Sequence, residues 1–240
     1  MTHTTTKGKL YLLPAPLGEN AHSETMPISV KNKIEELNHY VAENEKTARR
    51  YIKQIAPDKP QPELKFWILN KHTKASEIPT FLEACLNGKD MGLLSEAGCI
   101  GIADPGAEVV RIAHEKGIQV VPLVGPSSIL LTMMSSGLNG QNFAFHGYLP
   151  IDKSEKKLQI KRLERISLEQ NQAQIFIETP YRNEKFFEDL KQSLHPSTLL
   201  CIGCDVTLTT EYIKTQTISQ WKKTKPDLHK KPAIFIFQKE

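Results

Sequence analysis

The feature that most constrains the fold of this chain is the alternation of short apolar runs with longer amphipathic stretches. In the first half, strand-like runs occupy residues 9–15, 38–42, 65–70, 90–95 and 118–124. Helical patterns fill the gaps between them, at residues 28–37, 45–55, 77–87 and 105–116. Strands connected through helices pair in parallel, and such a sheet needs helices on both faces. We therefore predict a mostly parallel, doubly wound α/β sheet.

The second half begins in the same way and then changes. Helical patterns cover residues 126–136, 153–169 and 180–194, with strand-like runs at 142–150 and 174–179. Three further strand-like runs, at 198–206, 210–218 and 231–239, follow one another without long helices between them. Consecutive strands of this kind favour antiparallel pairing, so we predict a mixed sheet. The change of pattern predicts two α/β domains, at residues 1–124 and 125–240.

The helix predicted at residues 105–116 carries a start signal and a stop signal. Asp104 is a residue type that caps free backbone N–H groups, and Pro105 suits the first helical position. Gly117 can adopt the left-handed conformation that ends many helices. We therefore expect the helix to begin at Pro105 and to end at Gly117.

Composition excludes several classes of protein. The chain of 240 residues is 39% hydrophobic, and no run approaches the ~18 apolar residues of a membrane span. The N-terminus lacks the apolar core of a secretion signal, so we expect a soluble, cytoplasmic protein without membrane contact. The net charge of +4 permits an anionic partner, and basic residues gather at 46–53 and 150–165. Each of these stretches also fits a solvated helix face.

The chain has four cysteines, of which Cys201 and Cys204 form a C-x-x-C motif. Such a pair can mark a redox site or half of a zinc site. Here it lies inside an apolar, β-prone run, and no second pair completes a set of four ligands. We interpret both as buried strand thiols and expect no metal site.

Three loops follow predicted strands, where ligands bind in a doubly wound sheet. They span residues 14–20, 95–106 and 124–128. None has the glycine pattern of a dinucleotide-binding or nucleoside-triphosphate loop, so both of those classes lose their main support. Glycines in the second loop allow a close backbone approach to a ligand, or serve only as turn residues. In the third loop, Ser127 and Ser128 offer hydroxyl groups or cap the following helix.

Five ordered segments together resemble the tetrapyrrole methylase superfamily of S-adenosylmethionine-dependent methyltransferases. Within it, they are most similar to the branch that methylates a cytidine ribose 2′-oxygen in small-subunit ribosomal RNA. The segments are KLYLLPAPLGEN (9–20), SEAGCIGIADPG (95–106), VVPLVGPSSI (120–129), FAFHGYLPIDKSEKK (143–157) and FIETPYR (176–182). Five matches in order are specific, whereas any one of them would be weak.

The resemblance implies a cofactor cleft between the two α/β domains and a homodimer. Carried over by motif, the residues around S-adenosylmethionine are Leu17, Glu96, Gly98, Cys99, Ser127 and Ser128. The resemblance also implies Ile177, Glu178 and Ala233 as neighbours of the cofactor.

The departures from the family pattern fall on the substrate side. AENEKTARR (42–50) and NKHT (70–73) keep only part of the corresponding family motifs. Glu43 is our first candidate for a catalytic base and His72 our second, although a salt-bridged carboxylate is a common role for such a Glu. Candidate RNA phosphate contacts are Lys46, Arg49, Arg50, Lys156 and Lys157.

Three functional hypotheses remain open from the sequence. The leading one is a methyltransferase that acts on a ribose or base of ribosomal RNA. The second is a methyltransferase for a small molecule such as a tetrapyrrole. The third is a protein that binds S-adenosylmethionine or RNA without turnover, which the altered substrate motifs favour.

Overall fold

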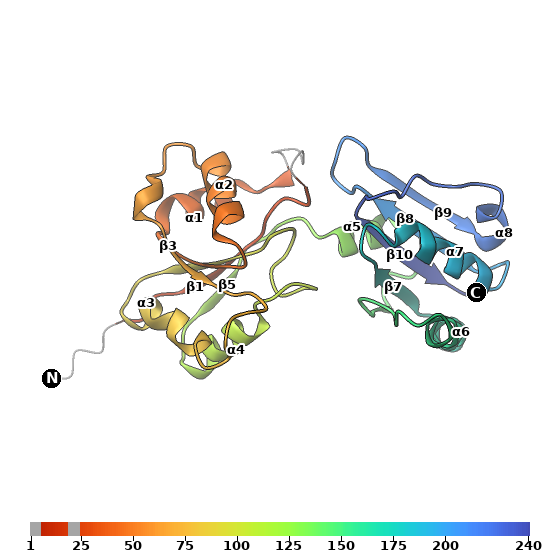
Figure 1. The fold of residues 1–240 in the computed structure, drawn as a ribbon, viewed down its shortest axis with the longest axis horizontal. Helices are drawn as coiled ribbons and strands as arrows, with labels where there is room; N and C mark the ends of the chain where they lie inside the picture. Colours follow the sequence, from red (N-terminus) through yellow and green to blue (C-terminus); the bar gives the residue numbers. More distant parts are fainter. Residues whose placement is uncertain (1–5, 19–24) are drawn as a thin grey trace. The chain divides into compact units, whose positions relative to one another are not determined.

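The computed structural model describes residues 6–18 and 25–240 of the chain. The chain forms two compact units, Met1–Pro126 and Ser127–Glu240 (Figure 1). Each unit has its own sheet and its own hydrophobic core. Within the described residues, no helix is long and apolar enough to cross a membrane.

The sheet of the first unit is entirely parallel. Its strands are β1 (Leu10–Leu13), β2 (His39–Ala42), β3 (Lys65–Ile68), β4 (Met91–Leu94) and β5 (Val120–Pro122). They lie in the order β3-β2-β4-β1-β5, and Leu10 of β1 pairs with Met91 on one side and Val120 on the other. The prediction of a mostly parallel sheet is confirmed.

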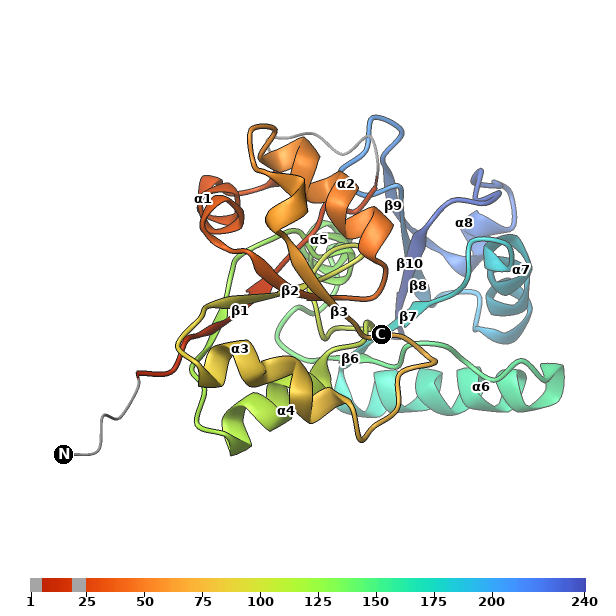
Figure 2. The same ribbon diagram turned by 60° about the vertical axis from the view of Figure 1, so that its left-hand side comes forward.

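Helices cover both faces of this sheet (Figures 1 and 2). On one face lie α1 (Ile28–Glu36) and α2 (Glu45–Ile55), and on the other lie η3 (Ile78–Leu82), α3 (Glu83–Leu86) and α4 (Ala107–Glu115). A short 3-10 helix, η2 (Gln61–Glu63), precedes β3. Each helical layer closes a separate apolar cluster, so the doubly wound arrangement predicted from the alternation is confirmed.

The predicted start of α4 is wrong, whereas its predicted end is right. The helix begins at Ala107 after Gly106, which has φ 134° and provides no side-chain cap. Asp104 instead accepts a hydrogen bond from Ser95 Oγ at 2.8 Å, because the preceding loop turns its carboxylate back toward the end of β4. Gly117 has φ 62°, and its N–H donates to the His114 carbonyl at 3.0 Å, as expected for a left-handed helix end.

The second unit has a mixed sheet. Its strands are β6 (Phe143–Phe145), β7 (Ala173–Ile177), β8 (Leu199–Cys204), β9 (Tyr212–Thr217) and β10 (Ala233–Gln238). Their order is β6-β7-β10-β8-β9, with β6 and β7 parallel and the remaining neighbours antiparallel. The mixed pairing predicted from the closely spaced last strands is confirmed.

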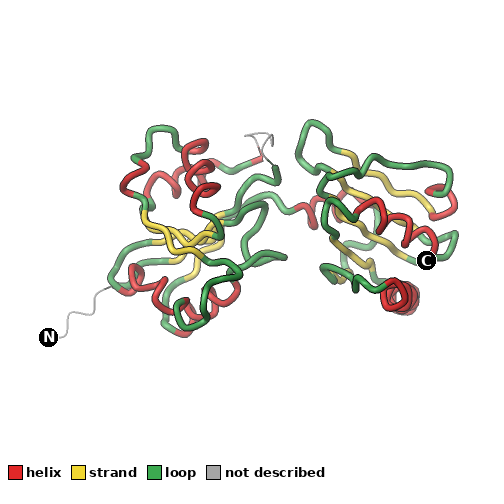
Figure 3. The backbone as a smooth tube through the Cα atoms, in the orientation of Figure 1, coloured by secondary structure: helices red, strands yellow, loops and turns green. Residues whose placement is uncertain are grey.

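Two helical layers also enclose this second sheet (Figure 3). One face carries α6 (Lys153–Gln170), α7 (Asn183–Ser193) and the one-turn helix α8 (Ile218–Trp221), over an aromatic core that includes Phe176 and Phe235. The other face carries α5 (Ser128–Ser136). The sequence did not predict α8, which begins with a capping box between Thr217 and Gln220.

Cys201 and Cys204 are buried on β8, as predicted. Because they are three residues apart on a strand, they face opposite sides of the sheet and join different apolar clusters. Burial raises the pKa of each thiol to about 11. Both residues therefore act as packing groups.

Candidate functional site

The first sheet has a topological switch point between β1 and β4. These strands are neighbours, yet the next helix after β1 is α1 on one face and the next helix after β4 is α4 on the other face. Beyond these loops, the chain continues to opposite faces of the sheet, which is the arrangement that opens a crevice at the carboxyl ends of the two strands. Open α/β sheets bind their ligands at such crevices.

The loops after β1, β4 and β5 converge at this point. The main chains of Ala15 and Gly98 exchange two hydrogen bonds, of 3.0 and 2.9 Å, which join the first loop to the second. Gly125 of the third loop packs so closely on the first that an added Cβ would lie 2.2 Å from Pro14 Cβ. Residues 19 and 20 of the first predicted loop lie outside the described residues.

Three of the predicted cofactor residues lie together where these loops meet. Gly98 has φ 71°, and an added Cβ would lie 3.1 Å from Leu17 Cδ2 and 3.3 Å from the Pro126 carbonyl oxygen. Cys99 Sγ lies 3.5 Å from the same Pro126 oxygen, and burial raises the pKa of this thiol. Glycine at position 98 therefore permits both the left-handed backbone and the close contact between loops.

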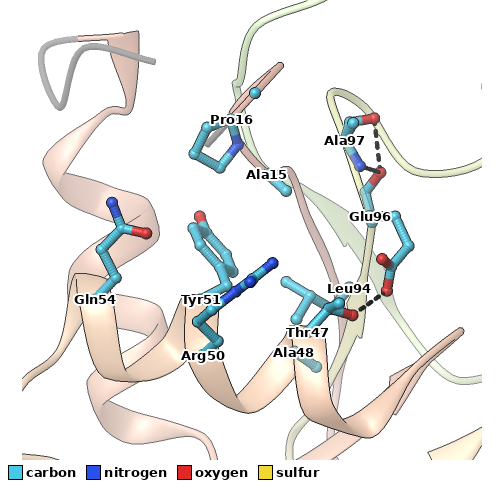
Figure 4. A pocket seen from close by; sticks show the side chains of 12 residues that line it. Ala15, Pro16, Thr47, Ala48, Arg50, Tyr51, Gln54, Leu94, Glu96 and Ala97 are labelled. Atoms are coloured by element: carbon cyan, nitrogen blue, oxygen red, sulfur yellow. Dashed lines mark hydrogen bonds between the residues drawn. The ribbon is translucent and has the colours of Figure 1, made fainter. Parts of the chain in front are cut away.

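A cavity of about 350 Å³ opens beside these loops, between the carboxyl ends of β1 and β4 and the helix α2. Figure 4 shows Arg50, Tyr51 and Gln54 projecting from α2 toward the loop that carries Pro16. The Tyr51 hydroxyl donates to the Pro14 carbonyl at 3.0 Å, and burial raises its pKa. The full lining is Ala15, Pro16, Gly18, Thr47, Ala48, Arg50, Tyr51, Gln54, Leu94, Ser95, Glu96 and Ala97. We call this the switch-point cavity.

Glu96 is held in the switch-point cavity by a residue that the sequence analysis missed. Thr47 Oγ1 donates to Glu96 Oε1 at 2.6 Å, a contact drawn in Figure 4. Thr47 lies in the first turn of α2 because the Asn44 side chain caps that helix, accepting from the N–H groups of Lys46 and Thr47. The spacing of Thr47, Tyr51 and Gln54 on one helix face was the available signal for this wall of the cavity.

Glu43 lies beside two other carboxyl groups. It follows β2 directly and lines a small pocket together with Asp104. Partial burial raises the pKa of Glu43, and the charges of Asp104 and Glu96 raise it further. Burial also raises the pKa of Asp104, against the hydrogen bond from Ser95, which lowers it. A carboxylate with a raised pKa is a stronger base than an ordinary one.

His72, the second candidate base, is exposed in the turn after β3. Its main-chain N–H donates to Asn70 Oδ1 at 2.9 Å, a bond that shapes the turn and leaves the ring uninvolved. Among the residues that the structure describes, none forms a hydrogen bond or ion pair with the imidazole that would position it for proton transfer. The geometry favours Glu43 over His72 as a base.

The predicted phosphate contacts in α2 differ in their surroundings. Lys46 is exposed in the first turn, and Arg50 lines the switch-point cavity. The Arg49 guanidinium is bound within the protein. It donates to Glu45 Oε1 at 2.8 Å, to the Gln61 carbonyl at 2.6 Å and to the Leu64 carbonyl at 3.2 Å. Those bonds hold the segment before β3 against α2, so the geometry favours a structural role for Arg49.

The predicted lysines of α6 also differ from each other. Lys156 is buried, with its Nζ atom 3.2 Å from Asp189 Oδ2, whereas Lys157 is exposed. A buried, paired ammonium is a poor candidate for an RNA contact, while Lys157 remains accessible in this unit.

In the second unit, Ser127 is the N-cap of α5, and its side chain accepts from the Leu130 N–H at 3.4 Å. Ser128 is the first residue of that helix. Ile177 ends β7 and Ala233 begins the neighbouring strand β10. Glu178 follows at the same strand end, where its carboxylate is buried against Arg182 Nη2 at 2.8 Å.

Comparisons with known proteins identify the relatives of this chain. No protein-family model matches it. It is 25% identical to ribosomal RNA small subunit methyltransferase I of Escherichia coli O157:H7, over 97% of this chain and 78% of that protein. It is 30% identical to the Haemophilus influenzae protein of the same name, over 72% of this chain and 61% of that protein. The Bacillus subtilis counterpart is 28% identical, over 86% of this chain and 64% of that protein.

Solved structures show the same architecture. The methyltransferase CobJ matches with a TM-score of 0.62 at 15% identity, over 96% of this chain and 94% of that one. The cobalt precorrin-4 methyltransferase CbiF matches with a TM-score of 0.61 at 12% identity, over 96% and 94%. Uroporphyrin-III C-methyltransferase from Thermus thermophilus, solved with S-adenosyl homocysteine, matches with a TM-score of 0.55 at 15% identity, over 97% and 98%.

The fold and these relatives define the class of the protein, a methyltransferase with the tetrapyrrole methylase fold. Its parallel and mixed five-stranded sheets match those of the solved members. More particularly, the chain is a homologue of the proteins named ribosomal RNA small subunit methyltransferase I. The resemblance drawn from the five sequence segments is confirmed.

Proposed function

We propose that the chain transfers a methyl group from S-adenosylmethionine to small-subunit ribosomal RNA, with a cytidine ribose 2′-oxygen as the acceptor. The observation that supports RNA as the substrate is the relationship to small-subunit ribosomal RNA methyltransferases, which extends over 97% of the chain. The switch-point cavity supports the proposal from the structure. It lies where an α/β sheet takes its ligands and is lined by both hydrogen-bonding and apolar groups.

The loops around the switch point fit the cofactor that the class requires. S-adenosylmethionine supplies a methyl group on a positively charged sulfonium. Gly98 leaves a backbone surface that a ligand can approach closely, and Glu96 places a carboxylate nearby that favours a cation. We propose Leu17, Glu96, Gly98 and Cys99 as the cofactor residues of the first unit. Those of the second unit would be Ser127, Ser128, Ile177, Glu178 and Ala233, as the family motifs imply.

Alignment and proton removal are the tasks left to the protein in such a transfer. Holding the acceptor oxygen ~3–3.5 Å from the methyl carbon supplies much of the acceleration. A ribose hydroxyl must also lose its proton, and Glu43 is the group that we propose to accept it. The raised pKa of Glu43 suits that role, because it makes the carboxylate a stronger base toward the proton of the ribose hydroxyl.

Arg50, Tyr51 and Gln54 give the switch-point cavity a cation, a ring and an amide on one helix face. A nucleotide offers a phosphate, a stacking surface and hydrogen-bonding edges, so these side chains match its chemistry. We propose them as substrate contacts, with Lys46 at the start of the same helix.

We also propose that the chain forms a homodimer, which sedimentation of the purified chain would test, and that it is located in the cytoplasm.

The decisive experiment is calorimetric titration with S-adenosylmethionine, followed by radiolabelled methyl transfer to unmodified small ribosomal subunits. Binding with transfer supports the proposal and justifies mapping of the nucleotide. Binding without transfer refutes the RNA substrate and favours a small-molecule substrate or a silent relative. Absence of binding refutes the cofactor assignment. A Glu96→Ala variant that binds the cofactor as tightly as the wild type would remove Glu96 from the proposed site.

A further inference from the structure

Another cavity lies in the second unit and is lined by residues of α6 and α7. Figure 2 shows the course of these two helices. Its volume of about 120 Å³ is well above the about 10–15 Å³ that a single water molecule needs. The lining comes from the first turns of α6 and the last turns of α7. It consists of Lys153, Lys156, Lys157, Asp189, Gln192 and Ser193. We call this the α6–α7 groove.

The floor of the groove is a buried ion pair. Lys156 Nζ lies 3.2 Å from Asp189 Oδ2, and the two side chains are only 9% and 8% exposed. The other carboxylate oxygen accepts from Lys185 Nζ at 2.5 Å. Burial alone would raise the pKa of Asp189, but the hydrogen bonds from Lys185 and Lys156 outweigh it and lower that pKa. The carboxylate is therefore fully neutralised by two lysines.

The rim of the groove carries two accessible cations. Lys153 and Lys157 are exposed and four residues apart, which places them about 6 Å apart along the axis of α6. Neither side chain has an ion pair or hydrogen bond with any residue that the structure describes. Gln192 and Ser193 add neutral polar groups on the opposite side. The groove thus combines excess positive charge, hydrogen-bond donors and empty volume.

We propose that the α6–α7 groove binds a backbone phosphate of the RNA substrate, with Lys153 and Lys157 as its two cationic contacts. This inference rests on the proposed function, since RNA is the polyanion that the proposed reaction provides. Lys156 is a positioning residue here, because its ammonium is paired with Asp189 and fixes α6 against α7. Of the three neighbouring lysines, Lys153 and Lys157 thus contact the phosphate, and Lys156 positions α6.

The test compares binding of unmodified small ribosomal subunits by the wild type and by the double variant Lys153→Gln/Lys157→Gln, at several salt concentrations. Each lost phosphate contact makes the slope of log K against log[salt] less steep by about 0.7–0.9. The slope for the double variant should therefore be less steep than that of the wild type by about 1.4–1.8. Its melting temperature and its affinity for S-adenosylmethionine should match the wild type. The control is Lys222→Gln/Lys223→Gln, which removes the same charge from exposed lysines outside the groove and should leave the slope unchanged.

If the Lys153→Gln/Lys157→Gln variant has the slope of the wild type, and the wild type methylates the subunits, the proposed function stands and phosphate binding in the α6–α7 groove is overturned. An equal loss in the control variant also overturns it, because the effect would then be general charge. A wild type that binds S-adenosylmethionine but neither binds nor methylates the subunits overturns both. For the positioning role, Lys156→Met should lower the melting temperature and change the slope by much less than one contact. A Lys156→Met variant of normal stability that loses a full contact would make Lys156 a ligand and overturn that role.

Discussion

The contact between Gly98 and its neighbouring loops should determine both the stability of the first unit and its affinity for the cofactor. In a Gly98→Ala variant, the left-handed backbone at φ 71° costs about 1–2 kcal/mol for a residue with a Cβ. The new Cβ would also lie 3.1 Å from Leu17 Cδ2 and 3.3 Å from the Pro126 oxygen, so both neighbours must move by a few tenths of an ångström. Overpacking of this kind adds about 1–3 kcal/mol.

The same loop contains a matched control. Gly101 has φ 78°, but no described atom lies within 4 Å of the position of an added Cβ. Gly101→Ala should therefore carry the backbone cost of about 1–2 kcal/mol without the steric cost. The difference between the free energies of unfolding of the two variants, measured in urea, gives the steric cost at Gly98. We expect Gly98→Ala to be less stable than Gly101→Ala by at least about 1 kcal/mol.

Calorimetry with S-adenosylmethionine then connects the contact to function. If the cofactor needs the loops in their native positions, Gly98→Ala should weaken binding by at least about fivefold, the equivalent of about 1 kcal/mol. Gly101→Ala should bind like the wild type. Equal stability and equal affinity in the two variants would refute the reasoning, because close packing at Gly98 would then have no part in forming the site.

Three further predictions concern single side chains. Glu43→Gln should retain cofactor affinity and lose about 10²–10⁴-fold in methyl transfer; an active variant would exclude Glu43 as the base. Because burial and the neighbouring carboxylates raise the pKa of Glu43, activity should be lost as the pH falls through that raised pKa. Asp104→Asn removes one of those charges and should move this acid limb to lower pH. Lys156→Met should lower the free energy of unfolding by about 1.5–3 kcal/mol, whereas Lys157→Met, which changes an exposed lysine, should stay within about 0.5 kcal/mol. Arg49→Met should lower the free energy of unfolding by about 1.5–3 kcal/mol, because the bonds of Arg49 to the Gln61 and Leu64 carbonyls are lost. It should leave the salt dependence of subunit binding unchanged, whereas that dependence would weaken if Arg49 contacted the RNA.

Local sequence patterns were enough to predict the helices and strands and the order in which they occur. The predicted helix at residues 45–55 matches α2 (Glu45–Ile55), and each predicted strand overlaps an observed one. Hydrophobic periodicity makes this possible, because it reports which side of each local segment is buried. The five motif segments likewise identified the family, since they consist of contiguous residues that need no knowledge of distant contacts.

The role of each polar side chain near those segments depends on contacts that form when the chain folds. Asp104 reads as a helix cap in the sequence, yet it accepts from Ser95 nine residues earlier. Lys156 and Lys157 are adjacent and chemically equal, yet one is buried against Asp189 and the other is exposed. Glu96 is held by Thr47, which is 49 residues away along the chain. A charged or hydroxyl group takes the partner that folding brings within hydrogen-bonding distance, and local sequence patterns carry no information about which distant segment that will be.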